Sequence, residues 1–414
     1  MKLSLTTILY MIVGVSTSII PTVLLTYGIS QFNIIRIVGQ ESATWWFSLS
    51  LGVVNLSLIF LNPLGGYFFD KLNSGLLSRR IWITLGSIFG FISMIAFSYS
   101  YNIPILIVFW VLTSFSYGLV SLLYFSIIPE LYDFEDYGKV SGLMGSLIPL
   151  TIMLLSVIIF GGFSDLSVKY KIILTACIQL IFNLAIVWFV DFSKKNNSPV
   201  KIISINKNNK DTTAPKIESY NNFIWTLLSR LSIHIVSSGL SMMTLFYIAR
   251  FHLSSEDVFK LQSITSLGIV FMIVSGIVSG YVSDRKRIKK PFIIFSAISL
   301  SVCMCLYSIS YSIVYIVVIS YFYQLVWGVF NSVDQALVNQ VLPSKEHCAK
   351  DLAIMNTTNN IAKALVSFAT PTIIYFGRIW MRDDGYTLFF LTMAAFSILS
   401  AIFVSKVNED SYPG

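Results

Sequence analysis

GYVSDRKRIKKP, residues 280–291, joins two long apolar runs in the second half of the chain. A related stretch, GYFFDK at residues 66–71, joins two apolar runs of the first half 214 positions earlier, and two arginines follow it after a longer turn. A second pair of landmarks keeps the same spacing, because Pro129 and Pro343, each at the end of an apolar run, are also 214 positions apart. Two landmarks at one offset indicate that a bundle of membrane helices is duplicated within the chain.

The residue types in the two stretches suit a loop that controls helix movement. Glycine lets two helices approach closely, aspartate accepts hydrogen bonds or an ion pair, and the basic side chains stay in water. The stretches lie at the ends of apolar runs, too far from mid-membrane to touch a central solute. We therefore expect five residues to act in conformational gating and not in substrate binding: Gly66, Asp70, Gly280, Asp284 and Arg285.

The pattern Gly-x-x-x-Asp-Arg/Lys, followed by basic residues, resembles the signature loop of the major facilitator superfamily. It stands between the second and third apolar runs and again between the eighth and ninth. The first copy departs from the pattern by an insertion at 72–78 and by Lys71 in place of arginine. The resemblance covers nearly the whole chain. It implies an all-α membrane protein with twelve transmembrane helices in two six-helix bundles.

The composition supports a membrane protein independently. The 414 residues are 55% hydrophobic and only 12% charged, which excludes an ordinary soluble protein. The net charge of +8 comes mostly from short loops beside apolar runs, so topology explains it better than a nucleic-acid partner. The four cysteines have no metal-ligand spacing, and we expect no metal or cofactor. The first apolar run is too long for a cleavable signal peptide.

Twelve apolar runs are long enough to cross a bilayer, which takes about 20 residues each. The predicted spans are 6–30, 43–68, 80–100, 104–128, 140–162, 171–191, 222–249, 262–283, 291–311, 313–341, 351–376 and 386–406. A polar stretch rich in Lys, Asn, Ser and Thr separates six spans from six. The predicted organisation is an N-terminal bundle at 1–192, a linker at 193–221 and a C-terminal bundle at 222–414.

The distribution of lysine and arginine predicts the orientation. With a cytoplasmic N-terminus, the inner segments hold about 19 basic residues and the outer loops about seven. Because each half has an even number of spans, both termini and the linker at 193–221 are expected on the cytoplasmic side. We expect a multi-pass protein of the cell membrane, surrounded by lipid and monomeric.

Charged side chains at membrane depth are costly and usually face a cavity or a partner. The C-terminal half has Arg230 and His234 in its first span, Asp334 in its fourth and Lys363 in its fifth. Arg230 and Asp334 are predicted at equal depth, roughly 12–14 Å from the cytoplasmic boundary, which permits a salt bridge. The pair either ties two spans together or breaks and re-forms during transport, and His234 is one turn from Arg230 on the same face.

Lys363 is predicted roughly 20 Å into its span, close to mid-membrane, where it cannot easily reach water. Together with Arg230 and Asp334 it leaves one excess positive charge. The cavity should therefore favour a neutral or anionic solute, or hold an anion or a deprotonated Lys363 when empty. Lys363 is our first candidate for a substrate-contacting and coupling residue.

Uncharged polar side chains complete the candidate substrate and coupling site. Amides recur at i and i+4 on the tenth span and cluster at the start of the eleventh, which favours a wet cavity. Hydroxyls and aromatic rings on the fourth span suit recognition of a sugar or another polyol. The residues concerned are Asn331, Gln335, Asn356, Asn360, Tyr117 and Tyr124.

A closer resemblance comes from SVDQALV at 332–338, followed by a Leu-Pro at 342–343 and KDLAIMN at 350–356. These stretches are similar to the glycoside and sucrose-type cation symporter branch and its bacterial relatives. In those relatives the eleventh span usually has Pro-Gln where this chain has Ala362-Lys363. That departure places a charge in the expected transport path and leaves the sugar specificity of the branch open.

The expected function is secondary active transport of a small polar solute, with a sugar as one candidate, by alternating access and coupled to protons or another cation. The alternative within transport is efflux of a drug or peptide-like metabolite, although the first half shows no buried carboxylate for a cationic drug. A non-transporting membrane sensor is a further alternative. No nucleotide-binding motif or catalytic triad is found, so we do not expect an enzyme.

Overall fold

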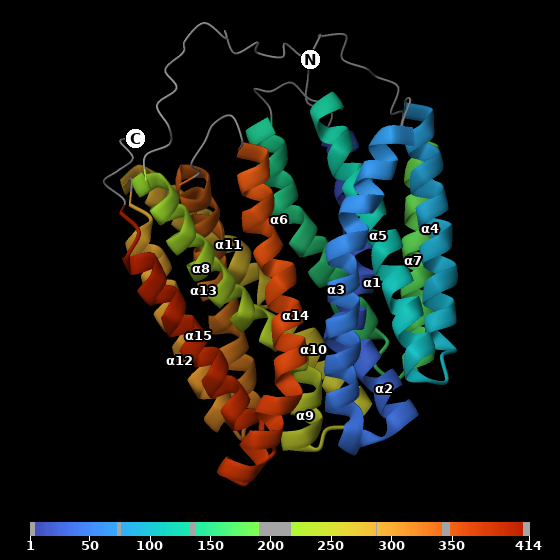
Figure 1. The fold of residues 1–414 in the computed structure, drawn as a ribbon. Helices are drawn as coiled ribbons and strands as arrows, with labels where there is room; N and C mark the ends of the chain where they lie inside the picture. Colours follow the sequence, from blue (N-terminus) through green and yellow to red (C-terminus); the bar gives the residue numbers. More distant parts are fainter. Residues whose placement is uncertain are drawn as a thin grey trace, which may run out of the picture.

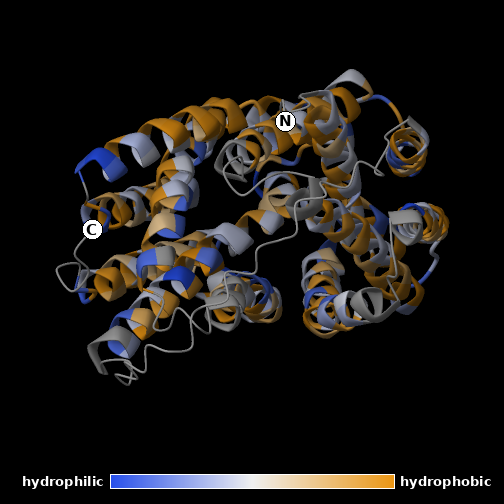
Figure 2. Cartoon of the chain, turned by 90° about the horizontal axis from the view of Figure 1, so that it is seen from above, coloured by the Kyte–Doolittle hydropathy of each residue, from blue (hydrophilic) through white to orange (hydrophobic). Residues whose placement is uncertain are grey.

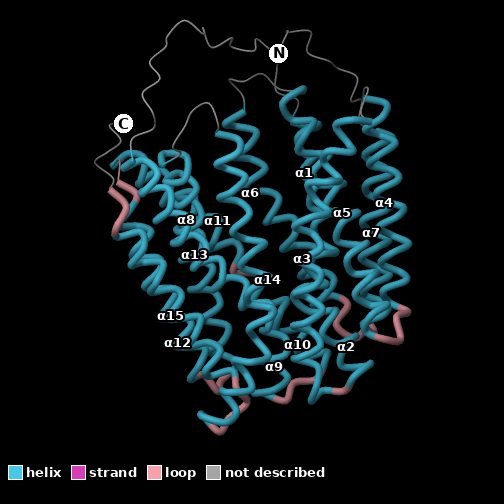
Figure 3. Tube along the Cα trace, viewed as in Figure 1, coloured by secondary structure: helices cyan, strands magenta, loops and turns pink. Residues whose placement is uncertain are grey.

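The computed structural model describes residues 5–72, 76–131, 137–189, 217–286, 288–341 and 348–408. Within these ranges all regular elements are helices, and twelve segments are long and apolar enough to cross a membrane (Figure 1). The predicted all-α membrane fold with twelve spans is therefore confirmed. The loops lie mostly at the two ends of the helices (Figure 3). Hydrophobic residues cover most of the helices, as surrounding lipid requires (Figure 2).

The first six spans pack around the first one. Two of them change helix type near one end, where a π-helical segment follows the α-helix. The elements are α1 (Leu5–Leu24), η1 (Leu25–Ile29), α2 (Ser30–Val38), α3 (Gln40–Leu72), α4 (Leu76–Ser98), α5 (Ile103–Leu131), α6 (Tyr137–Ser156), η3 (Val157–Gly162) and α7 (Val168–Phe189). Helix α1 contacts α5, α6 and α7, and α4 packs on α5 and α7.

The last six spans repeat this arrangement around α8, which contacts α13, α14 and α15. Helix α12 packs on α13 and α15, and α11 packs on α13. The elements are α8 (Ile217–Gly239), η4 (Leu240–Met242), α9 (Met243–Phe251), α10 (Ser255–Ser266), α11 (Ile269–Lys286), α12 (Lys290–Ile309), α13 (Ile313–Val341), α14 (Cys348–Met381) and α15 (Tyr386–Ser405). Most of the predicted linker at 193–221 is outside the described residues, and α8 begins at its end.

The first span is longer than the predicted 6–30, because its helix continues to Val38. The prediction ended the span where polar residues begin. Gln31 and Asn33 are nevertheless buried, and the Gln31 Nε2 donates a hydrogen bond to the Ser241 carbonyl oxygen at 3.1 Å. The polar side chains therefore continue the helix into a contact between the two halves instead of leaving it for water.

The two halves meet mainly on one side of the molecule. The start of α1 and the end of α15 lie on the same side of the molecule, which we call the terminal face (Figure 1). Towards the opposite face, α10 contacts η3, while η1 contacts η4 and α9. Helix α3 of the first half also packs along α14 of the second.

Candidate functional site

A cavity of about 480 Å³ lies between the two halves. Its volume is in the range of small-molecule binding sites. Four elements of the first half, α1, η1, α6 and η3, contribute to its wall, and the second half contributes the larger part. The polar and aromatic lining residues include Tyr27, His234, Ser237, Gln262, Tyr323, Trp327, Asn331, Asn359 and Lys363.

Lys363 lines the cavity from α14 and is half-buried. Among the described residues, its ammonium group has no ion pair or hydrogen bond. The residues that line the cavity include no aspartate or glutamate. The cavity therefore combines one lysine with no lining carboxylate, which agrees with the excess positive charge predicted from the sequence.

An aromatic surface on α13 forms part of the cavity wall. The rings of Tyr323 and Trp327 are stacked, with centroids 6.1 Å apart and planes inclined by 10°. The His234 ring meets Trp327 edge-on, with centroids 6.4 Å apart. Residues 323 and 327 are four apart and so share one face of the helix. Such a surface can contact the apolar face of a ring-shaped solute.

Beside this surface lies the predicted ion pair between α8 and α13. The Arg230 Nη1 is 3.4 Å from the Asp334 Oδ2, and the two side chains are 8% and 5% exposed. The Arg230 Nη2 donates to the Gln335 Oε1 at 3.2 Å, and its Nε lies 3.4 Å from the His234 Nε2. Since His234 lines the cavity, the pair is joined to the cavity by one side chain.

The predicted amides are only partly brought to the cavity. Asn331 lines it, but on α14 the lining amide is Asn359 and not the predicted Asn360. Asn360 is half-buried outside the lining, and the side chain of Asn356 is outside the described part of the chain. A one-residue difference turns a helical side chain by about 100°, so the sequence alone did not separate positions 359 and 360.

Tyr117 and Tyr124, predicted as substrate contacts, are not brought to the cavity. Both are fully buried inside the first half. The Tyr124 hydroxyl is 2.9 Å from the Asn183 Oδ1, and the ring covers Gly14 of α1. The ring of Tyr117 covers Gly90 of α4. Each tyrosine fills the space that a glycine leaves, so both pack helices together in this conformation.

The predicted gating residues are at the terminal end of their helices, away from the cavity. A methyl group on Gly280 would lie 2.7 Å from the Ser332 Oγ, so glycine lets α11 and α13 approach closely here. Gly66 has no described atom within 4 Å of such a methyl group, and the close approach expected there is made by the preceding Gly65, which faces α5. Asp284 and Arg285 are exposed, and the side chain of Asp70 is outside the description.

Towards the opposite face, an aromatic ring of the second half packs on Phe160 of the cavity wall, and sequence reasoning missed it. Phe259 of α10 lies between two rings of the first half, with centroids 5.0 Å from Phe32 and 5.1 Å from Phe160. The Lys171 Nζ lies 4.3 Å from the Phe259 ring centroid and donates to the Ser164 carbonyl oxygen at 2.8 Å. From the sequence, Lys171 at the start of a span indicated only the orientation of the chain in the membrane.

Hydrogen bonds between the two halves reinforce the contact made by Phe259. The Thr244 Oγ1 donates to the Tyr27 carbonyl oxygen at 2.8 Å. The Gln262 Nε2 lies 2.5 Å from the same oxygen and 2.6 Å from the Thr244 Oγ1. Because Tyr27 belongs to the first half and the other two to the second, these bonds must break if the halves separate here.

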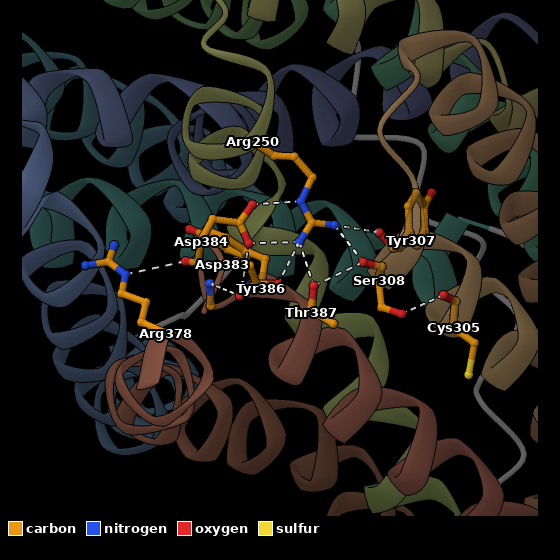
Figure 4. Close-up of polar contacts among 10 residues, drawn as sticks. Arg250, Cys305, Tyr307, Ser308, Arg378, Asp383, Asp384, Tyr386 and Thr387 are labelled. Atoms are coloured by element: carbon orange, nitrogen blue, oxygen red, sulfur yellow. Dashed lines mark hydrogen bonds and ion pairs between the residues drawn. The ribbon is translucent and has the colours of Figure 1, made fainter. Parts of the chain in front are cut away.

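A second buried arginine, also not predicted, stands at the other end of the α8–α9 span (Figure 4). The Arg250 Nε and Nη2 bind the two carboxylate oxygens of Asp384 at 2.7 and 2.8 Å. The Nη1 donates to the Ser308 carbonyl oxygen at 2.7 Å and the Nη2 to the Thr387 Oγ1 at 2.9 Å. The cluster connects α9, the end of α12 and the start of α15.

The fold and the central cavity are those of a polytopic membrane transporter, and the sequence comparison agrees. The pattern of the Major Facilitator Superfamily matches residues 3–367. The chain therefore belongs to this family, which indicates a transporter with a small-molecule substrate. No curated protein matches the chain.

Solved structures of the same fold cover nearly the whole chain. A D-xylose-proton symporter superposes with a TM-score of 0.73 at 15% identity, covering 97% of each chain. The xylose transporter XylE from E. coli, in an inward open conformation, gives 0.66 at 16% identity over 97% of this chain and 94% of that one. The nucleoside transporter NupG gives 0.67 at 13% identity over 97% and 99%. At these identities the likeness concerns the fold alone.

Proposed function

We propose that the chain is a secondary active transporter that moves a small polar solute across the cell membrane by alternating access. A sugar is the first candidate solute, and protons or another cation drive the movement. The observation that carries the proposal is the cavity between the two halves, which is lined by hydroxyl, amide and aromatic side chains and by Lys363. The fold relatives that transport xylose and nucleosides support a polar solute.

The contacts between the halves support the transport cycle. Phe259, Gln262 and Thr244 close the molecule towards the opposite face through contacts with residues of the first half. Rocking of the 1–192 bundle against the 222–414 bundle would break these contacts and open the cavity on that side. We further propose that both termini and the 193–221 linker are cytoplasmic, so the closed side is the outer side.

Orientation has its own test. A cysteine introduced into the 193–221 linker, in a chain otherwise free of cysteine, should react with a membrane-impermeant maleimide only after the cells are opened. Labelling of intact cells at that position would reverse the proposed orientation.

Alternating access is tested by locking the closed side. A Cβ atom on Gly161 of η3 would lie 3.1 Å from the Ser263 Cβ of α10. Disulfides have a Cβ–Cβ separation of about 3.5–4.5 Å, so the two helices need to move apart by only about 0.5 Å for the bond to form. In the cysteine-free chain, the pair Gly161→Cys and Ser263→Cys should form a disulfide between the halves. We expect oxidation to stop transport in reconstituted vesicles and reductant to restore it.

The controls are the two single-cysteine variants, which should transport equally with and without oxidant. Substrate and driving ion are sought in the same vesicles by screening radiolabelled sugars and other polar solutes with and without an imposed pH gradient. Transport that continues at full rate through a quantitatively cross-linked pair would contradict alternating access at this cavity.

A further inference from the structure

We propose that the solute is a small hydroxylated carboxylate of the sugar-acid class, bound through its carboxylate to the ammonium group of Lys363. This inference rests on the proposed function and names the substrate class for the same cavity. The ring of the solute is expected to lie against Tyr323 and Trp327 of α13, and the hydroxyl groups of the solute are expected to bind uncharged polar atoms of the cavity wall.

The charge of the cavity carries the first step. Lys363 is half-buried, and in the described part of the chain its ammonium group meets no carboxylate. The neighbouring Arg230 and Asp334 lie 3.4 Å apart and offset each other. The cavity thus has one net positive charge in a region of low dielectric, where an uncompensated charge is costly. A neutral solute would leave that charge in place when the cavity closes, whereas one carboxylate would neutralise it.

The uncharged wall carries the second step. The Tyr323 hydroxyl and the Gln262 Oε1 are buried, line the cavity and have no hydrogen-bond partner within the described ranges. Buried polar atoms without a partner destabilise a structure unless a ligand or water satisfies them. A hydroxyl group of a solute can donate to the Gln262 Oε1 and can either donate to or accept from the Tyr323 hydroxyl.

The aromatic surface gives the third step. Tyr323 and Trp327 present two nearly parallel rings beside His234. Their faces can contact the C–H groups of a sugar ring, while the amide of Asn331 lies one turn further along the same helix wall. An acyclic dicarboxylate would leave the stacked rings unused, could not donate to the Gln262 Oε1, and would bring a second negative charge. The three features together therefore select a ring-shaped monocarboxylate with hydroxyl groups.

The electrostatic step can be tested without knowing the solute. Ser237 lines the cavity, and its Oγ bonds only within its own helix, to the His234 carbonyl oxygen at 3.1 Å. In the cysteine-free chain, Ser237→Cys should react faster with the anionic sulfonatoethyl methanethiosulfonate than with the cationic trimethylammonioethyl reagent. With each rate normalised to a free thiol, we expect a preference of at least about tenfold.

Variants assign the preference to one residue. Lys363→Gln should bring the normalised rates close to each other, and Lys363→Glu should reverse their order. The matched control is Lys260→Gln, which removes the same charge from an exposed position on α10 and should leave the preference unchanged. Equal normalised rates in the Ser237→Cys chain that keeps Lys363 would overturn the proposal, and that measurement needs no variant at position 363 to fold.

The substrate class is tested with three sugars of matched size. D-glucuronate should compete for the cavity and be transported, whereas D-glucose and the cationic D-glucosamine should be at least about tenfold weaker. Lys363→Gln should remove the advantage of glucuronate over glucose. Glucose transported as well as glucuronate, with the disulfide lock still effective, would overturn the sugar-acid inference alone. Failure of the disulfide lock would instead overturn the proposed function.

Discussion

The span formed by α8 and α9 has a buried arginine towards each end, and the two are held differently. Arg250 binds both carboxylate oxygens of Asp384 at 2.7 and 2.8 Å and also a backbone carbonyl oxygen of Ser308 at 2.7 Å. Arg230 meets Asp334 at 3.4 Å. Short bidentate bonds between charged groups are strong and geometrically specific, whereas a longer contact next to a cavity is easily rearranged. The Arg250–Asp384 pair is therefore suited to holding the helices together, whereas the Arg230–Asp334 pair is suited to rearranging during transport.

The largest expected effect comes from removing the carboxylate of Asp384. Asp384→Asn would leave the positive charge of Arg250, whose side chain is 1% exposed, without its main partner. Breaking a buried ion pair from one side costs about 3–5 kcal/mol. We expect a corresponding loss in the free energy of unfolding, measured by denaturation in detergent.

The matched control is the neighbouring Asp383, whose Oδ2 lies 3.6 Å from the Arg250 Nη2 and whose side chain is 18% exposed. Asp383→Asn should cost clearly less stability than Asp384→Asn. Equal unfolding curves for the two variants would remove the distinction between the close and the distant carboxylate.

Sequence reasoning found one of these arginines and missed the other for a physical reason. Arg230 is eight residues inside a predicted span, so its charge demanded a partner at equal depth, and Asp334 was available. Arg250 lies one residue beyond the predicted end at 249, where a basic residue is ordinary. Its burial depends on Asp384, which precedes α15, and on Ser308 at the end of α12, and no local pattern indicates that these two segments pack against it.

The same limit applies to the cavity. Lys363 was singled out because a charge at membrane depth is costly, and the structure places it in the cavity wall. The faces of uncharged residues depend on packing partners that the sequence does not show. Tyr117 and Tyr124 therefore pack against glycines inside the first half, whereas Phe259 packs against Phe160 across the two halves. In the sequence, all three are simply aromatic residues of apolar spans.

Neutralising both members of the Arg230–Asp334 pair tests whether this pair is structural or acts in transport. Asp334→Asn alone should reduce transport by at least about tenfold, because it removes the carboxylate that lies 3.4 Å from the Arg230 guanidinium beside the cavity. The double variant Arg230→Gln/Asp334→Asn removes both charges and should recover most of the stability that the single change loses. Transport measured in vesicles then decides between the two roles of the pair.

If the pair only ties α8 to α13, the double variant should transport normally. If it acts in the transport cycle, as we propose, the double variant should fold and remain inactive. The corresponding double neutralisation at Arg250 and Asp384 serves as the control, since it should change stability and leave the transport rate per folded molecule unchanged.

Lys363 extends the comparison to a third cation, which has no carboxylate partner among the described residues. If it carries the coupling proton and releases it as the solute leaves, Lys363→Gln should abolish or uncouple the pH dependence of transport and preserve the fold. Initial transport rates across a pH series, with and without an imposed gradient, measure this. An unchanged rate and an unchanged pH response would remove Lys363 from the site.

The smallest effect on stability is expected at Asp284, an exposed carboxylate at the terminal end of α11. It lies well away from the cavity wall, so Asp284→Asn should leave equilibrium binding of the solute largely intact. Water already solvates this carboxylate, and surface charges contribute little to stability. Its position beside Gly280, where α11 and α13 approach closely, connects it to relative helix movement. Transport should therefore slow while binding persists, and a large loss of binding at normal turnover would place Asp284 in the solute site instead.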